Sequence, residues 1–495
     1  MKAVITGAAV AALVLAAGAA RAHDPHECPP GFPDEPTIPG HIEQADIVDG
    51  FYDFKELLEV GEELFVAMFN VCDGQGRPAT TGAGEARDPD EPAFIRTSSP
   101  EANSCAGCHN GPRVGGAGDF VANVFVLAQA TDPVTSSVSP EFSNERNTLG
   151  MFGSGAIEML AREMTADLQS QATALPDGNH VLVSKGVEFE ITTSSGDVIA
   201  AKGLDTDLIV KPFHQAGVVT SVREFTVNAY NHHHGMQAEE RFDLNLSKGF
   251  DPDFDMDGVE RELTIGDITA ATLFQAALGV PGRRHPATRD ERHEVERGES
   301  IFSEIGCASC HKPALKLDNR YFVEPNPLNP QGTFSDTSQS IRFDLTKDGE
   351  WPRLERTRGG GALVRAYTDL KRHNLCDEDI RFLCNEQLAQ GRPDQHGRPG
   401  AEFFITRKLW DVGNSAPYGH RGDLTTITDA ILVHGGEARA SRDAFLAQLI
   451  EDQAAVVKFL KTLQVLPPDS QHDFVRHRPR HGMRGDHGFD RARRR

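Results

Sequence analysis

Two copies of one five-residue pattern, Cys-x-x-Cys-His, dominate the sequence of this 495-residue chain. The first copy ends in His109 and the second in His311, and their cysteines are Cys105, Cys108, Cys307 and Cys310. This spacing is the attachment signature of a c-type haem. Two thiols bond to the two vinyl groups of one porphyrin, and the next residue places an imidazole under the iron. The pattern therefore predicts two covalently bound haems, with His109 and His311 as their proximal iron ligands.

Two other kinds of site also use closely spaced cysteines. A zinc site usually pairs two Cys-x-x-Cys motifs and needs no histidine directly after them. A thioredoxin-type redox motif follows a strand in a βαβ unit, and the sequence shows no such unit. The haem interpretation is therefore favoured over both.

The first residues have the features of a secretory signal peptide. Lys2 precedes an apolar run over residues 3–20, and Ala20-Arg21-Ala22 fits the small-x-small rule for cleavage. An uncleaved membrane anchor is the alternative, but the alanine-rich run is marginal in length for a span. We therefore expect a periplasmic, soluble protein with no membrane span after signal cleavage. Four further cysteines, Cys28, Cys72, Cys376 and Cys384, then lie in an oxidising compartment. They can pair in three ways, and proximity in the sequence favours Cys28–Cys72 and Cys376–Cys384.

The formal net charge of −23 bears on the partners of the chain. An acidic protein repels the phosphates of nucleic acid and anionic lipid, so neither is expected as a partner. We expect a small redox protein or cytochrome as electron donor, and the acidity weakly favours a basic one.

Hydrophobic periodicity places helices at residues 51–70, 293–311 and 442–463. Between them, residues 180–212 alternate apolar and polar side chains around Ser-Gly-Asp, which predicts a β-hairpin or small sheet. We expect a mainly α fold, with two cytochrome c-like haem domains and a small inserted β region. The expected boundaries are a signal peptide at 1–22, an N-terminal haem c region at 23–170, an insert at 171–285, a C-terminal cytochrome c domain at 286–468 and a disordered basic tail at 469–495.

The sixth ligand of each iron decides the chemistry, because a filled position passes electrons and an open one binds peroxide or oxygen. His434 follows Ile427 and Ile431 on one helical face, and Gly435-Gly436 end that helix, so His434 is the candidate for the second haem. The alternative is a core histidine bonded to a backbone carbonyl. For the first haem the candidates are one of His232, His233 and His234, or else His214 or Met236. Consecutive helical side chains point roughly 100° apart, so the three neighbouring histidines cannot serve one metal together.

Two sets of acidic residues each have a functional interpretation and a purely structural one. Asp253, Asp255 and Asp257 alternate before Gly258, as in a calcium loop, but Thr264 stands where the closing glutamate belongs and Glu262 would have to replace it. The alternative is an acidic surface turn. Glu158 and Glu163 are candidate proton-handling groups, because splitting peroxide needs a base and an acid. The alternative is that both are carboxylates on a helix surface.

A third sequence signature points to a family. It comprises Thr406-Arg407-Lys408-Leu409-Trp410, then Pro417-Tyr418-Gly419-His420-Arg421-Gly422, and then the ending AILVHGGEA. Together with the two haem motifs it resembles the superfamily of bacterial di-haem cytochrome c peroxidases, and most closely the di-haem oxidoreductase (putative peroxidase) family. The resemblance covers roughly residues 55–466. It implies that His434 ligates the second haem and that Glu158 corresponds to a distal-site glutamate.

The sequence departs from the peroxidase pattern in two places. Residues 110–130 contain no His or Met that could switch on and off the first iron, and the only Trp residues are Trp351 and Trp410. We expect a reactive haem on His109 and an electron-relay haem on His311 and His434. The expected reaction is reduction of hydrogen peroxide or oxidation of a substrate. The alternatives are a pure electron-transfer cytochrome with no open iron, and a di-haem oxygenase.

Overall fold

The computed structural model describes residues 28, 34–75, 102–118, 121–123, 145–242, 258–384, 402–419, 421–468 and 470. The predicted signal peptide, the three aspartates of the predicted calcium loop and nearly all of the predicted C-terminal tail lie outside these ranges. Within them, no helix is both long and apolar enough to cross a membrane.

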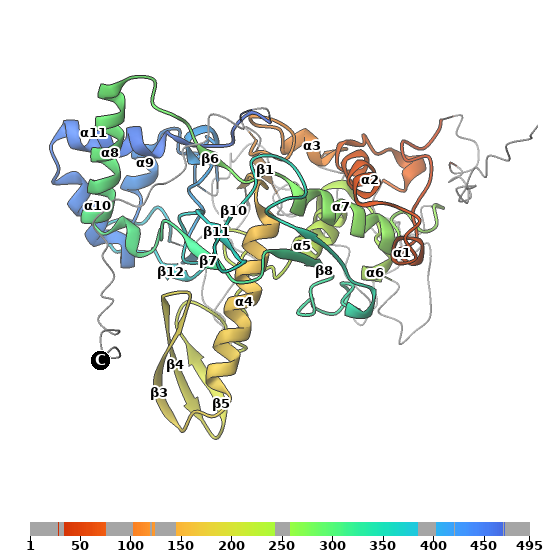
Figure 1. Ribbon diagram of the computed structural model, residues 1–495, viewed down its shortest axis with the longest axis horizontal. Coiled ribbons are helices and arrows are strands. Elements are labelled where there is room, and N and C mark those ends of the chain that lie inside the picture. Colours follow the sequence, from red (N-terminus) through yellow and green to blue (C-terminus); the bar gives the residue numbers. More distant parts are fainter. Residues whose placement is uncertain are drawn as a thin grey trace, which may run out of the picture.

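The helices form two groups at opposite ends of the molecule (Figure 1). One end holds α1 (Gln44–Val48), α2 (Phe54–Val66), α3 (Cys105–Cys108), α5 (Val222–Ala229), α6 (Glu239–Phe242) and α7 (Ile265–Ala277). The other end holds α8 (Arg289–Glu304), α9 (Ile427–Leu432), α10 (Arg439–Leu446) and α11 (Ile450–Leu460). The long helix α4 (Ser154–Ala172) starts in the middle and runs outward.

Each haem motif follows a helix that is crossed closely by a second helix. In α2, a Cβ added at Gly61 would lie 2.2 Å from the carbonyl oxygen of Ala270 in α7. In α8, a Cβ added at Gly298 would lie 1.9 Å from the carbonyl oxygen of Ala455 in α11. Only a residue without a side chain allows backbones to approach this closely. The two glycines therefore set how α2 and α8 pack, and so where the following motif lies.

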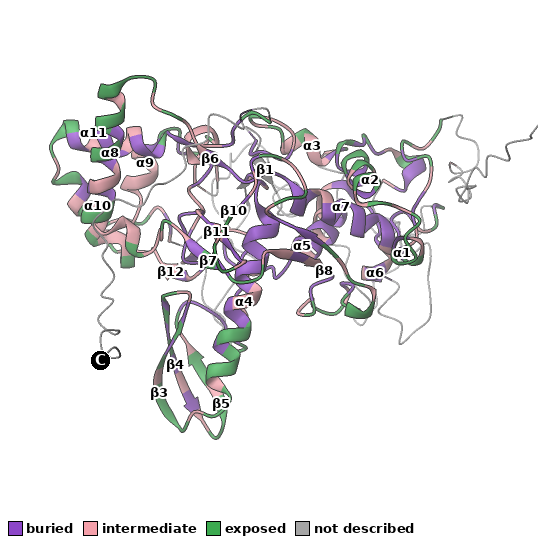
Figure 2. Cartoon of the chain, viewed as in Figure 1, coloured by how far each residue is buried: buried purple, intermediate pink, exposed green. Residues whose placement is uncertain are grey.

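The strands form two- and three-stranded antiparallel sheets. Strands β3 (Gly178–Ser184), β4 (Val187–Ser194) and β5 (Asp197–Ala201) make a meander in the order β3-β4-β5 that projects from the body beside the outer end of α4 (Figure 1). The turn between β4 and β5 uses Ser195 and Gly196, both at positive φ, as a tight hairpin requires. Figure 2 shows that the inner end of α4 is buried and its outer end exposed.

The remaining sheets are short. They pair β1 (Val121–Asn123) with β2 (Glu145–Asn147), β6 (Gly282–Arg283) with β14 (Leu463–Gln464), β8 (Tyr321–Glu324) with β9 (Ile341–Asp344), and β12 (Arg372–Asn374) with β13 (Phe403–Ile405). Strand β11 (Ala362–Val364) lies between β10 (Glu355–Arg356) and β7 (Leu315–Leu317).

The prediction of a mainly α fold with β structure only in a small insert is wrong. Helices make up 36% and strands 16% of the structure, and most strands follow the second haem motif. The physical reason lies in residues 313–374, which contain short runs rich in apolar residues, such as 315–317 and 321–324 between Pro313 and Pro325. Runs of this length are too short for helices and alternate buried and exposed side chains as strands do.

All three predicted helices differ from the observed ones at their ends. The helix predicted at 293–311 is α8, which begins at Arg289 and ends at Glu304, before the second haem motif. Helix α2 begins at Phe54, because Asp53 and Glu56 form a capping box, and it ends at Val66, which leaves Met68 63% exposed. The predicted helix at 442–463 is two helices, α10 and α11, with extended backbone at Leu449 between them. Leu449 was expected on the buried stripe but is 63% exposed.

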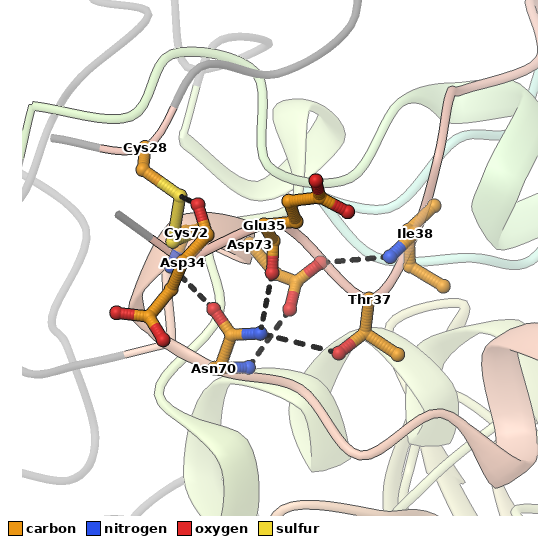
Figure 3. Close-up of a disulfide and its surroundings, with 8 residues drawn as sticks. All are labelled: Cys28, Asp34, Glu35, Thr37, Ile38, Asn70, Cys72 and Asp73. Atoms are coloured by element: carbon orange, nitrogen blue, oxygen red, sulfur yellow. Dashed lines mark hydrogen bonds between the residues drawn. A yellow bond between two sulfur atoms is a disulfide. The ribbon is translucent and has the colours of Figure 1, made fainter. Parts of the chain in front are cut away.

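Both predicted disulfides, Cys28–Cys72 and Cys376–Cys384, are confirmed. Around the first, Asn70 donates from Nδ2 to the carbonyl oxygen of Glu35 at 3.1 Å, and Asp73 accepts from the backbone N–H of Ile38 at 2.9 Å (Figure 3). The disulfide and these bonds fix the segment after α2 to Cys28 and residues 34–38. The segment after α2 also contacts the first haem motif, since the N–H of Phe69 donates to the carbonyl oxygen of Asn103 at 2.9 Å.

The part of the chain around the first haem motif packs on the part around the second. Asn147 donates from Nδ2 to the carbonyl oxygens of Pro417 at 2.6 Å and Gly419 at 3.2 Å. Nearby, Trp410 is buried against Gly153, where an added Cβ would lie 2.4 Å from the indole ring. Segments close to the first motif and close to the second thus pack directly on one another.

Candidate functional site

Both haem motifs open onto one cavity of about 790 Å³. It is lined by all of the motif cysteines and histidines, namely Cys105, Cys108, His109, Cys307, Cys310 and His311. His434 lines it as well, together with apolar side chains such as Phe225, Ile427 and Leu460. The structure therefore brings the predicted attachment residues of both haems to a single, mostly apolar space.

A repeated pattern places an aromatic ring beside each motif histidine. The ring centroid of Phe65 lies 6.3 Å from that of His109, with an interplanar angle of 52°. Phe302 lies 6.4 Å from His311, with an angle of 49°. Both phenylalanines end the pattern Gly-Glu-x-x-Phe, at residues 61–65 and 298–302. The sequence prediction missed this repeat, although the shared pattern in the helix before each motif could have revealed it.

His311 and His434 are spaced as two axial ligands of one metal. Their ring centroids are 6.4 Å apart, with an interplanar angle of 57°. Metal–nitrogen bonds of about 2.0 Å, with each ring centre about 1.1 Å beyond its nitrogen, put two opposite imidazoles roughly 6.2 Å apart. The observed spacing therefore leaves room for one metal ion between these two rings. His434 lies just after the end of α9 rather than within the helix, where the sequence pattern predicts it.

The histidines of the site share one hydrogen-bonding arrangement. His109 Nδ1 lies 3.3 Å from the carbonyl oxygen of Gly116, His311 Nδ1 lies 3.1 Å from that of Tyr367, and His434 Nδ1 lies 2.7 Å from that of Ala430. A carbonyl only accepts, so Nδ1 carries the proton and Nε2 keeps its lone pair, which is the form that binds a metal.

Burial keeps these rings neutral. It lowers the pKa of His109 and His311 to about 4, and it lowers the pKa of His434 as well. At neutral pH all three can therefore act as ligands without first losing a proton. A backbone hydrogen bond and metal ligation use different nitrogens, so the two interpretations offered for His434 are compatible.

The run of three histidines lies in a π-helical turn, Tyr230–His234, at the end of α5. His232 and His233 line the cavity, and their ring planes are 76° apart, so they face different directions. His234 also lines it, with Nε2 3.3 Å from the Sγ of Cys105 and Nδ1 2.6 Å from the carbonyl oxygen of Ala102. A thioether sulfur bonds to the porphyrin rim and not to the iron, so His234 lies at the rim side.

The two other candidates near the first haem differ from each other. His214 lines the cavity. Met236 is fully buried in the hydrophobic core and is not among the cavity-lining residues. The geometry thus favours histidine over Met236 as a group that faces the first haem.

Glu158 lies behind the cavity wall. It is fully buried in α4, where it accepts a hydrogen bond from the backbone N–H of Val222 at 2.8 Å and from Asn326 Nδ2 at 3.0 Å. Val222 lines the cavity and Glu158 does not. Burial, together with the nearby charge of Glu324, raises the pKa of Glu158 to about 8. Glu158 is therefore a buried carboxyl that holds a proton at neutral pH, one residue away from the cavity.

Glu163 has a structural role. It accepts from Lys185 Nζ at 2.6 Å and from the backbone N–H groups of Asp318 at 2.9 Å and Asn319 at 2.7 Å. These bonds hold the outer part of α4 against the β7–β8 connection. Of the two candidate proton-handling carboxylates, only Glu158 lies near the cavity.

A pair of carboxylates surrounds His373 beside the second motif. Its Nε2 lies 3.0 Å from Asp369 and its Nδ1 lies 3.0 Å from Glu437. Burial lowers the pKa of His373, but the hydrogen bonds to Asp369 and Cys310 outweigh it and raise the pKa to about 10. In the described residues, Cys310, Asp369 and His373 form the one group of three spaced for a metal ion. Cys310 is also a cysteine of the second haem motif, and a thioether bond to a porphyrin would take its sulfur from such a site.

The motif cysteines fit a covalently attached haem. None of the four is in a disulfide, while the other four cysteines are paired. Burial raises the pKa of the Cys105 thiol to about 12 and that of Cys307 to about 11. Two pairs of free thiols beside an apolar cavity, with an imidazole next to each pair, match the residues that covalent haem attachment requires.

The described part of the predicted calcium loop serves other contacts. Thr264 is the N-cap of α7, with its side chain accepting from the N–H of Asp267. Glu262, offered as a replacement for the closing glutamate, is buried and accepts from the backbone N–H of Gln237 at 2.6 Å. The three aspartates lie outside the described residues, so calcium binding stays a prediction.

Comparison with known proteins points to one family. Residues 354–463 match the model of the family described as "Di-haem oxidoreductase, putative peroxidase". The predicted family resemblance is confirmed over that range. No curated protein matches the chain.

Two solved structures are similar at low identity. A hydrazine synthase from Kuenenia stuttgartiensis, pressurised with xenon, is 14% identical, with a TM-score of 0.35, over 94% of this chain and 100% of that one. A MauG-like protein associated with microbial copper homeostasis is 16% identical, with a TM-score of 0.26, over 62% of this chain and 88% of that one.

Proposed function

We propose that this chain is a secreted, periplasmic di-haem c-type oxidoreductase of the peroxidase kind. One observation carries the proposal: both Cys-x-x-Cys-His motifs open onto a single cavity, in which His311 and His434 are 6.4 Å apart. The family match over residues 354–463 supports the same class of protein. A small redox protein or cytochrome would supply the electrons from outside.

The two haems have different roles in this proposal. A haem on Cys307 and Cys310 would be held by His311 and His434, and ligation by two imidazoles would suit it to storing or relaying an electron. A haem on Cys105 and Cys108 would be held by His109. This haem would be the reactive one, either with no further protein ligand or with a weakly bound histidine of the cavity.

The chemistry that a bound haem supplies is one-electron transfer and activation of a peroxide O–O bond. The surrounding residues have other tasks. Backbone carbonyls at Gly116, Tyr367 and Ala430 orient the imidazoles, and the apolar wall limits access of water. Glu158 holds a proton behind Val222. Reduction of one hydrogen peroxide to two waters consumes two electrons and two protons, so a protonated carboxyl close to the cavity is useful there.

Optical titration of the purified mature protein tests the proposal. Addition of cyanide, carbon monoxide or hydrogen peroxide to the oxidised and half-reduced forms should perturb one haem spectrum and leave the other unchanged. If no ligand perturbs either haem, the protein is an electron carrier with both irons closed. Stable binding of dioxygen would instead favour an oxygenase. A mass equal to that of the bare chain, or absence of a Soret band, would overturn the haem assignment altogether.

A further inference from the structure

A basic pair of residues, Arg407 and Lys408, lies on the wall of the shared cavity. Both line it, together with Asp411 four residues after Arg407. They belong to the segment between β13 and the next 3-10 turn, and Leu409 of the same segment packs against the hydrophobic cluster around α8 and α11. The cations are therefore fixed to the wall between the two haem motifs.

The charges of this segment are not balanced. Arg407 Nη2 lies 3.3 Å from Asp411 Oδ2, and Asp411 is 2% exposed, so the one carboxylate is engaged by Arg407. Among the described residues Lys408 makes no side-chain hydrogen bond or ion pair. The charge of Arg407 lowers its pKa and the charge of Asp411 raises it, so both act on Lys408 without a direct contact to it.

An ammonium in such a place is costly. Burial, and then the charge of Arg407, lower the pKa of Lys408 to about 8. Lys408 is only half-buried and lines a mostly apolar cavity, so a ligand that fills the cavity would meet this cation, and opposite charge on the ligand would compensate it. A rigidly held ammonium beside a guanidinium matches a carboxylate group.

We propose that Lys408, supported by Arg407, binds a carboxylate group inside the cavity. Two sources carry that chemistry: a propionate of an attached haem, or a small carboxylate that enters as a ligand. The inference rests on the proposed function, because the cavity must hold the porphyrins. A propionate is favoured, since each haem brings two carboxylates into this cavity.

Spectroelectrochemical titration of the holoprotein tests the propionate source. A positive charge beside a haem favours its reduced form, so Lys408→Met should lower the midpoint potential of one haem by the equivalent of a tenfold change in its reduction equilibrium, about 59 mV for one electron. Lys408→Arg keeps the charge and should stay near the wild type. The control Lys347→Met removes an exposed charge outside the cavity lining and should change neither potential.

Titration with acetate tests the other source. If a free carboxylate is the ligand, acetate will perturb the wild-type spectrum saturably, Lys408→Met will bind it at least tenfold more weakly, and the potentials without acetate will not move. If Lys408→Met leaves both potentials and the acetate response unchanged, the inference is wrong. Should Lys408→Met fail to accumulate, Lys408→Gln provides the same measurements. Absence of haem from the wild type would show separately that the proposed function has failed.

Discussion

Replacement of Arg223 by methionine should destabilise the protein in a pH-dependent way. Arg223 is fully buried in α5, with Nε 2.8 Å from Glu240 and Nη1 3.0 Å from Glu324, both also fully buried. It also donates to Thr269 Oγ1 at 2.8 Å and to the carbonyl oxygen of Ile265 at 3.0 Å. The methionine side chain fills similar space but leaves two buried carboxylates without the cation that contacts both of them directly.

The magnitude follows from that arrangement. Removing one partner of a buried ion pair costs about 3–5 kcal/mol, because the remaining charge stays desolvated. A loss of this size corresponds to a fall in Tm of about 3–7 °C for a cooperative unit of several hundred residues. Thermal unfolding of the holoprotein, followed by circular dichroism, measures it. The control Lys55→Met removes the cation of a surface ion pair with Glu59, in which Lys55 is 80% exposed, and should leave Tm unchanged.

The pH dependence identifies the cause. Burial raises the pKa of Glu240 and of Glu324 even with Arg223 present, and without it both rise further. When the pKa of a carboxyl is higher in the folded than in the unfolded protein, the free energy of unfolding falls as pH rises from the unfolded pKa to the folded pKa. The destabilisation should therefore be smaller at pH 5 than at pH 8, and adding Glu240→Gln and Glu324→Gln should reverse much of it. Equal losses at both pH values would refute this reasoning.

Three further changes have specific expected outcomes. His434→Ala should convert one haem from low spin to high spin in optical and EPR spectra, because it removes the ring 6.4 Å from His311. Gly298→Val should cost about 1–3 kcal/mol or more in thermal unfolding, since the new Cβ would lie 1.9 Å from the carbonyl oxygen of Ala455. Glu158→Gln should make the protein more stable than the wild type at pH 8, with the difference shrinking toward pH 5. The reason is that the pKa of Glu158 is about 8 in the folded protein and lower in the unfolded chain. As pH rises between these two pKa values, the unfolded chain releases the proton more readily, and the wild type loses stability that the Gln variant keeps.

Each of these has a discriminating counter-result. An unchanged spin state in His434→Ala excludes His434 as an iron ligand. Gly359→Val is the matched control for Gly298→Val, because nothing lies within 4 Å of a Cβ there, and similar losses in both variants would refute the helix-crossing argument. Identical pH profiles of Glu158→Gln and the wild type would show that Glu158 is ionised in the folded protein.

The meeting of the two motifs could be expected from the sequence only in part. Haem attachment requires fixed spacings, so the motifs name six candidate residues without any knowledge of the fold, and the structure brings all six to one cavity. The pairing of Cys376 with Cys384 follows from short loop closure. The helix before each motif was also predictable, because its apolar stripe is regular over several turns.

The positions of other groups depend on tertiary packing. Glu158 looks like a residue of a helix surface, yet residues 154–161 of α4 are all buried because α5, α7 and β8 surround them. Burial on all sides leaves no amphipathic period to read. Likewise, the π-helical turn at Tyr230–His234 places His234, of its three histidines, against Cys105, and no local pattern specifies such a turn.

The packing of residues 147–154 on residues 410–419 has a consequence for any attempt to divide the chain. A fragment that starts near residue 286 would carry the second haem motif and its helices, but it would expose the indole of Trp410 and the backbone oxygens of Pro417 and Gly419 that Asn147 satisfies. A fragment that stops before residue 286 would lose the same contacts from the other side. We therefore expect fragments with only one haem motif to aggregate or be degraded. Only fusions or deletions that keep both haem motifs and the contact between them should give a folded protein.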